Sequence, residues 1–128
     1  MSVLAARIRD KQQREVDFVV QRGRDAVDAI ECKPKGIESL EWLAQAFSGC
    51  DVYVEIDVGA ARCGVAPDQA AVDLAKRAAS KPSLKFKGLQ AYHGSAQHLR
   101  TPAERKAAIQ SASAKSAQAK ALIEKAGV

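Results

Sequence analysis

The sequence predicts an α/β protein built on one mixed sheet, in which an N-terminal antiparallel hairpin is continued by parallel strands. Two short runs rich in β-branched residues flank a glycine-containing turn near the N-terminus, and helix-like and strand-like runs alternate from residue 37 onward. Neighbouring strands with a short turn favour a hairpin, whereas a helix between two strands is typical of a parallel sheet. The hydrophobic content of 47% is high enough for a buried core, so a folded chain is expected.

The first part of the chain, residues 1–50, is expected to be a hairpin followed by a helix. The hairpin should occupy residues 15–33, with Gly23 in its turn, because glycine adopts the positive φ that short hairpin loops often need. Pro34 then breaks the strand pattern. Apolar residues recur at helical spacing over residues 37–47, which predicts the helix.

The second part, residues 51–128, follows the order strand, loop, helix, strand, loop, which is typical of parallel βαβ units. We expect the strands at residues 51–58 and 84–92, and a helix that begins near Pro67, where proline costs no helical hydrogen bond. The residues expected on the buried face of that helix are small or β-branched: Ala71, Val72, Ala75 and Ala79.

A long helix is expected at the C-terminus. Thr101 and Glu104 have the spacing of a capping box, with proline between them at the first helical position, and no helix breaker follows before Gly127. At about 1.5 Å per residue such a helix exceeds about 30 Å, longer than a small domain usually covers. It could pack against a second copy of the chain or remain partly exposed.

Composition narrows the class of protein. The three cysteines lack CxxC spacing, so neither a disulfide framework nor a zinc knuckle is indicated. No run approaches the roughly 18 apolar residues of a membrane helix, and the N-terminus lacks the apolar core of a secretory signal, so we expect a cytoplasmic protein with no membrane partner. The net charge of +5 favours phosphate-bearing partners, including nucleic acid, but acidic residues lie among the basic ones, and a solvated surface explains them more simply.

Two carboxylates and a lysine are expected to meet on one face of the hairpin. Residues two apart in a strand share a face, so Glu31 and Lys33 point the same way, and Asp17 can approach from the neighbouring strand. Carboxylate oxygens suit Mg²⁺ or Mn²⁺, and a lysine beside the metal can orient a water that attacks phosphorus. The pattern therefore predicts hydrolysis of phosphodiesters.

The runs EVDFVV and IECK within residues 9–48 resemble the PD-(D/E)XK nuclease-like domain found at the C-terminus of certain AAA-type ATPases. The resemblance implies that Asp17 and Glu31 bind the metal. It also implies that the carbonyl of Cys32 adds a third oxygen and that Lys33 is the catalytic lysine. A solvated charge cluster without any metal is the alternative explanation of the same residues.

The remainder of the chain carries a second resemblance. Its motifs are VEIDVG at 54–59, RCGV at 62–65 and GLQAYHGSAQHLRT at 88–101. These residues resemble D-threonine aldolase and its relatives, the alanine-racemase-like barrels that carry pyridoxal phosphate. The resemblance covers residues 51–128 and implies a partial (β/α) barrel, with functional loops at the C-terminal ends of the strands.

In that family the arginine matching Arg62 lies near the phenolic oxygen of the cofactor, and the histidine matching His93 lies against its ring. The lysine that binds the cofactor lies on the first barrel strand, which this sequence does not include, so no covalent attachment is expected at the family position and a pyridoxal phosphate cofactor is not expected. Imidazole and thiolate side chains at the same mouth could hold a transition metal, but ordinary hydrogen bonds within the loops explain these residues more simply. The residues concerned are His93, His98, Asp57 and Cys63.

The chain is thus expected to join pieces of two families, and the function expected first is a metal-dependent hydrolase of phosphate esters that uses Asp17, Glu31 and Lys33. The alternative is a folded chimera without native catalysis, or a remnant of an aldolase-like enzyme that still binds pyridoxal phosphate. Because a partial barrel leaves strand edges uncovered, we also expect self-association into a homo-oligomer.

Overall fold

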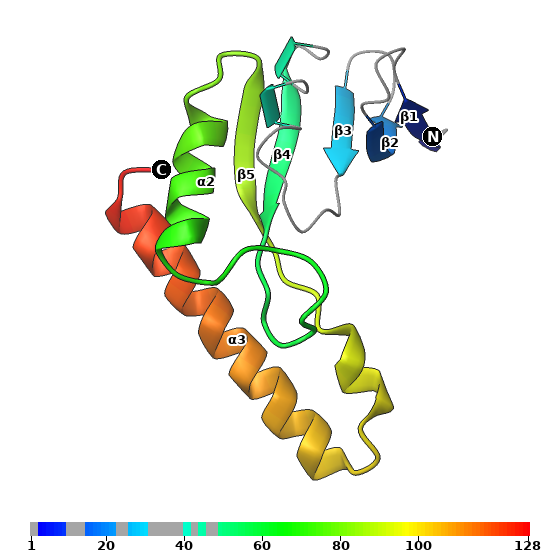
Figure 1. Cartoon of the computed structure of the whole chain (residues 1–128), viewed down its shortest axis with the longest axis vertical. Helices are drawn as coiled ribbons and strands as arrows, with labels where there is room; N and C mark the ends of the chain where they lie inside the picture. Colours follow the sequence, from blue (N-terminus) through cyan, green and yellow to red (C-terminus); the bar gives the residue numbers. More distant parts are fainter. Residues whose placement is uncertain (1–2, 10–14, 23–25, 31–39, 42–43, 46–48) are drawn as a thin grey trace. The chain divides into compact units, whose positions relative to one another are not determined.

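The computed structural model describes residues 3–9, 15–22, 26–30, 40–41, 44–45 and 49–128. Within these residues, five strands form one sheet in which the spatial order is the sequence order (Figure 1). The strands are β1 (Val3–Arg9), β2 (Glu15–Arg22), β3 (Ala26–Ile30), β4 (Cys50–Glu55) and β5 (Leu84–Gln90). The helices are α2 (Gln69–Ala79), the short 3₁₀ helix η1 (Gly94–His98) and α3 (Pro102–Lys125).

The sheet is mixed. Strand β2 pairs antiparallel with both β1 and β3, whereas β3 pairs parallel with β4 through Asp28 and Asp51. Strands β4 and β5 are also parallel, because the residue numbers of both strands increase in the same direction from one backbone hydrogen bond between them to the next. The nitrogen of Gly49 lies 2.8 Å from the oxygen of Ser83, and the nitrogen of Ile56 lies 2.9 Å from the oxygen of Gln90. A mixed α/β fold with parallel strands is therefore confirmed.

Strand β1 was not expected from the sequence. Its seven residues, VLAARIR, contain two alanines and two arginines, which are poor strand formers and good helix formers. The strand pairs with β2, with a register shift between Ala6 and Ile8. Pairing with a neighbouring strand therefore outweighs local propensity at this position.

Helix α2 buries a face of small residues. Ala71, Val72 and Ala75 are buried as expected, but Ala78 is buried in place of Ala79, which is exposed. A spacing of four and then three residues follows the helical period more closely than two successive steps of four. The helix begins at Gln69 because the Asp68 carboxylate, just before it, accepts a hydrogen bond from the backbone of Ala70 at 2.9 Å.

The chain divides into two compact units. One unit comprises Met1–Tyr53 and Lys76–Lys87, and the other comprises Val54–Ala75 and Gly88–Val128. The C-terminal ends of β4 and β5 and the loops that follow them belong to the second unit. The functional chemistry expected from the aldolase resemblance therefore lies within that unit.

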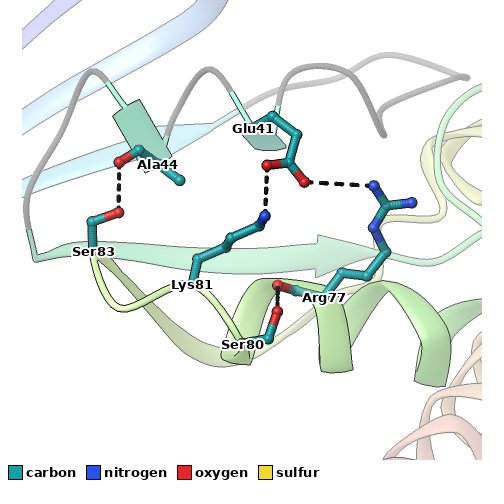
Figure 2. A network of polar contacts seen from close by, with 6 residues as sticks. All are labelled: Glu41, Ala44, Arg77, Ser80, Lys81 and Ser83. Carbon is teal, nitrogen blue, oxygen red and sulfur yellow. Dashed lines mark hydrogen bonds and ion pairs between the residues drawn. The ribbon is translucent and has the colours of Figure 1, made fainter.

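In the first unit, a polar network holds part of the predicted 37–47 helix (Figure 2). Residues 40–41 and 44–45 are helical, and the rest of that segment lies outside the described residues. Lys81 donates to the Glu41 carboxylate at 2.5 Å, and Arg77 lies 3.6 Å from its other oxygen. The hydrogen bond from Lys81 lowers the pKa of Glu41. The Ser83 hydroxyl donates to the carbonyl of Ala44 at 2.6 Å, which adds a second link.

In the second unit, α3 begins as the sequence predicts. The backbone of Glu104 donates to the Thr101 hydroxyl at 3.2 Å, and the backbone of Thr101 donates to the Glu104 carboxylate at 2.9 Å, so the capping box is complete. The helix ends two residues before Gly127, whose φ is +84°. The long C-terminal helix is thus confirmed (Figure 1). Among the helices of the described part of the chain, none combines the length and apolar character needed to cross a bilayer.

Candidate functional site

The loop after β4 leaves the strand and returns to pair with its end. The backbone nitrogen of Asp57 donates to the carbonyl of Val65 at 2.8 Å, and the nitrogen of Val65 donates to the carbonyl of Glu55 at 2.9 Å. These bonds form a parallel bridge between Ile56 and Val65. The intervening residues are therefore held as a closed loop at the C-terminal end of a parallel strand, where α/β proteins usually place their chemistry.

The side chain of Asp57 shapes this loop from inside. Its carboxylate accepts hydrogen bonds from the backbone N–H groups of Gly59 at 2.9 Å and Ala61 at 3.1 Å. These bonds favour the charged form and lower the pKa of Asp57. The Asp57 carboxylate therefore stabilises the turn that follows it. From α3, the Lys115 ammonium also contacts this turn, because it donates to the carbonyl of Val58 at 3.4 Å.

Removing this carboxylate should change stability in a pH-dependent way. Asp57→Ala removes both accepted bonds and should lower the free energy of unfolding by about 1 kcal/mol, as loss of a helix cap does. Asp57→Asn keeps a neutral acceptor. Because the pKa of Asp57 is lowered by folding, its ionised form adds stability above the ordinary carboxyl pKa of about 3.9, and that stability is lost as the pH falls through the folded value.

The stability gap between the wild type and Asp57→Asn should therefore be widest near neutral pH and shrink below about pH 4. Urea unfolding of both proteins at several pH values measures this gap. A gap that is constant across the range would show that the charge of Asp57 adds nothing to the turn.

Two glycines allow the loop to close. Gly64 has a φ of +94°, and a Cβ built there would lie 2.7 Å from the carbonyl carbon of Ile56. Gly59 has a φ of +139°, and a Cβ there would lie 2.8 Å from Nε2 of His93. Only glycine suits both backbone conformations and leaves room for these approaches. Gly64 therefore brings the loop against its own strand, and Gly59 brings it against the loop that follows β5.

The loop after β5 is tied to the first loop through Ser95. Its hydroxyl lies 3.1 Å from Nδ1 of His93 and donates to the carbonyl of Gly59 at 3.4 Å. Ala96, in the middle of η1, is buried and anchors this turn. The loops that carry Arg62 and His93 are thus joined by direct contacts.

A hollow of about 290 Å³ lies between the two loops. Polar and apolar atoms contribute about equally to its lining, which comprises Glu55, Ala60, Arg62, Cys63, Tyr92, Gly94, Ser95, Gln97 and His98. Burial raises the pKa of Glu55, and the positive charge of Arg62 opposes that rise. An acidic and a basic side chain therefore influence each other in the wall of this hollow.

His93 lines a second hollow, of about 480 Å³, beside α3. Its other lining residues are Ala91, Tyr92, Ile109, Ala112, Ser113 and Ser116. Tyr92 is common to the two hollows. The structure therefore joins the loops that carry Arg62 and His93 but places their side chains in adjoining hollows.

Several lining residues were not singled out from the sequence, notably Glu55, Tyr92 and Ser95. All three lie within the motifs at 54–59 and 88–101, so their proximity to the strand ends was the available signal. No group of three or more His, Cys, Asp or Glu side chains that could hold a metal ion occurs among the residues that the structure describes. The four residues weighed for a transition metal do not form such a group.

Comparison with known proteins identifies the family. Residues 15–127 match the family model of the alanine racemase N-terminal domain. The chain belongs to this family. The match begins at the first residue of β2, so it includes the hairpin region as well as the loops that follow β4 and β5.

Aldolases are among the most similar members of this family. The chain is 43% identical over 86 residues to a D-threonine aldolase from an Arthrobacter species, and 46% identical over 77 residues to a 3-hydroxy-D-aspartate aldolase from Paracoccus denitrificans (strain Pd 1222). These matches cover 67% and 60% of the chain but only 23% and 20% of the relatives. The chain therefore spans about a quarter or less of their length.

The crystal structure of D-threonine aldolase from Filomicrobium marinum has the same fold in the matched region. The TM-score is 0.70 at 40% sequence identity, and the match covers 72% of this chain and 26% of that one. The mixed α/β fold is accordingly part of an alanine-racemase-like barrel.

These findings correct the function expected first. A metal-dependent hydrolase of phosphate esters is wrong, and so is its PD-(D/E)XK nuclease character, because the family match includes the hairpin region and the relatives are aldolases. Asp17 lies in β2, while Glu31, Cys32 and Lys33 lie outside the described residues. Charged residues alternating along a strand also occur on solvated sheet faces, so the short motif was too weak to decide.

The cofactor expectations also need correction. The Mg²⁺ or Mn²⁺ ion was inferred only from the hydrolase reading, and the comparisons give it no support. The expectation that pyridoxal phosphate is unlikely is wrong as well. The resemblance assigned this cofactor to the alanine-racemase-like barrels, and the chain is a member of that family.

Proposed function

We propose that this chain forms part of the pyridoxal phosphate site of an aldolase that acts on a D-amino acid with a hydroxyl group on its β-carbon. The relatives support this substrate class, since D-threonine and 3-hydroxy-D-aspartate share that chemistry. The observation that carries the proposal is the hollow between the loops that follow two neighbouring parallel strands. Catalytic residues of barrel enzymes lie at this end of the strands.

The chemistry of the hollow fits an anionic, aromatic cofactor. Arg62 supplies a guanidinium, Tyr92 supplies a hydroxyl group, and His98 supplies an imidazole. Arginine is well suited to phenolate and phosphate oxygens because its planar fork makes charge-assisted hydrogen bonds. The volume of about 290 Å³ lies near the lower end of the range of about 300–1,000 Å³ seen for small-molecule sites.

Within this proposal, Arg62 holds the phenolic oxygen of the cofactor in the first hollow, and the cofactor ring extends past Tyr92 to lie against His93 in the adjoining hollow. The positive charge of Arg62 opposes the rise that burial causes in the pKa of Glu55, so the two side chains attract each other in the wall of the hollow. The closed loop from Glu55 to Val65 fixes the position of Arg62 before the cofactor arrives, so little ordering entropy is lost on binding. When bound, pyridoxal phosphate supplies an electron sink for reactions at the α-carbon of an amino acid.

Binding of pyridoxine 5′-phosphate tests the proposal. This alcohol retains the ring, phenolic oxygen and phosphate but has no aldehyde, so it cannot condense with surface lysines. Isothermal titration calorimetry should show saturable binding to the chain. Arg62→Ala should weaken that binding at least about tenfold, or about 1.4 kcal/mol, because it removes a charge-assisted hydrogen bond.

Arg100→Ala is the matched control. It removes the same charge from an exposed residue that lines neither hollow, so its affinity should stay within about twofold of the wild type. The proposal fails if no saturable binding occurs. It also fails if the two arginine variants lose affinity equally, because net charge alone would then explain the attraction.

A further inference from the structure

The Ser95 hydroxyl lies within hydrogen-bonding distance of two groups, and it can donate its single proton to only one of them. It is 3.4 Å from the carbonyl of Gly59 and 3.1 Å from Nδ1 of His93. A carbonyl oxygen can only accept, and a hydroxyl has a single proton to donate. If that proton goes to Gly59, the contact with His93 is a hydrogen bond only when Nδ1 carries the proton and donates.

We propose that Ser95 is a positioning residue that holds His93 as the Nδ1–H tautomer. The hydroxyl oxygen accepts a hydrogen bond from Nδ1–H of His93, and the hydroxyl donates a hydrogen bond to the carbonyl of Gly59 in the neighbouring loop. Nε2 of the neutral imidazole is then left without a proton and serves as an acceptor. The hydrogen bond made by one ring nitrogen thus decides the protonation of the other.

Packing of the imidazole supports a fixed orientation. A Cβ at Gly59 would lie 2.8, 3.1 and 3.4 Å from three adjacent atoms of the His93 ring. The Cβ position is nearest to Nε2, so the backbone of Gly59 lies beside this part of the ring, at a place where a side chain would collide with it. The ring therefore has Gly59 beside Nε2 and Ser95 beside Nδ1, and His93 itself is only half-buried.

The consequence for the cofactor rests on the proposed function. A histidine that lies against a pyridoxal ring would offer it an uncharged imidazole with a hydrogen-bond acceptor at Nε2. The alternative tautomer would present a donor at the same point. Ser95 would in this way determine whether Nε2 of His93 donates or accepts a hydrogen bond. Its own hydroxyl proton is donated to Gly59 and not to the cofactor.

Nitrogen NMR of the cofactor-free chain tests the tautomer directly. The sequence contains only two histidines, so the ring signals of His93 and His98 are separated by a single assignment variant, His98→Gln. At about pH 8, where ordinary imidazoles are uncharged, we expect His93 to show a protonated Nδ1 and an unprotonated Nε2. Free histidine side chains in water favour the opposite form.

Ser95→Ala should shift the His93 signals toward the Nε2–H form, and Ser95→Thr, which retains a hydroxyl, should restore the wild-type pattern. His98 is an internal control because its Nε2 lies 3.4 Å from the side-chain nitrogen of Gln97, and its signals should not change in either variant. The inference is overturned if wild-type His93 is in the Nε2–H form, or if Ser95→Ala leaves its signals unchanged.

Pyridoxine 5′-phosphate titrations separate this inference from the proposed function. Since the NMR experiment contains no cofactor, the expected tautomer pattern supports the role of Ser95 even if calorimetry finds no binding, which would defeat only the proposed function. The converse result is also informative. If the wild type binds pyridoxine 5′-phosphate, Arg62→Ala abolishes that binding, and His93 is the Nε2–H form, then the proposed function stands and the role of Ser95 is rejected.

Discussion

Gly64→Ala is expected to lower the free energy of unfolding by roughly 2–5 kcal/mol. About 1–2 kcal/mol comes from placing a side chain at a φ of +94°, and about 1–3 kcal/mol comes from overpacking. The new Cβ would lie 2.7 Å from the carbonyl carbon of Ile56 and 2.8 Å from the nitrogen of Asp57. Both are backbone atoms at the bridge that closes the loop, so neither can move without breaking its hydrogen bonds.

Gly127→Ala separates the two contributions to that loss. Gly127 has a similar φ of +84°, but nothing lies within 4 Å of the Cβ position there. This control should therefore lose no more than about 1–2 kcal/mol. Urea unfolding measures both variants, with an unchanged slope showing that the unfolded state is unaffected. Equal losses would mean that the approach of Gly64 to the strand is not close enough to matter.

Gly59→Ala is expected to damage the candidate site far more than the fold. Its Cβ would lie 2.8 Å from Nε2 of His93, which is the end of a side chain and can rotate away. The histidine should then leave Ser95, and its ring signals should lose the Nδ1–H pattern. If the proposed function holds, affinity for pyridoxine 5′-phosphate should fall at least about tenfold, or about 1.4 kcal/mol.

The matched control for this change is Gly88→Ala. Gly88, in β5, has a φ of +149°, close to the +139° of Gly59, but its Cβ would meet nothing within 4 Å. The two variants should lose similar amounts of stability, while only Gly59→Ala alters His93. Unchanged nitrogen signals in Gly59→Ala would show that the histidine does not depend on this glycine.

The sequence predicted those helices and strands that are determined by residues close together in the chain. The start of α3 follows from Thr101 and Glu104, whose side chains satisfy each other's backbone groups without help from distant residues. Strands β4 and β5 were recognised from their β-branched and apolar runs. Strand β1 was missed because its alanines and arginines favour a helix, and only its pairing with β2 makes it a strand.

The candidate site could be predicted only as far as its loops. The motifs around Arg62 and His93 indicated the correct strand ends, but the separation of these side chains into adjoining hollows depends on how the backbone closes. That closure comes from the Asp57 turn and from the approach of Gly59 to His93. Both are long-range or conformational features that residue types and spacing do not specify. The prediction of a hydrolase was wrong because three charged residues on a hairpin do not by themselves determine which reaction, if any, a protein catalyses.

The closed loop after β4 also bears on how the members of this family can diversify. Its base, at Glu55 and Val65, is secured by backbone hydrogen bonds, which any amino acid except proline at the donor positions can make. Apart from Asp57, Gly59 and Gly64, the side chains of this loop can therefore be exchanged during evolution without changing the path of the backbone. Such a loop suits a family whose members include aldolases for both D-threonine and 3-hydroxy-D-aspartate, because a changed side chain in the loop leaves the backbone hydrogen bonds at its base in place.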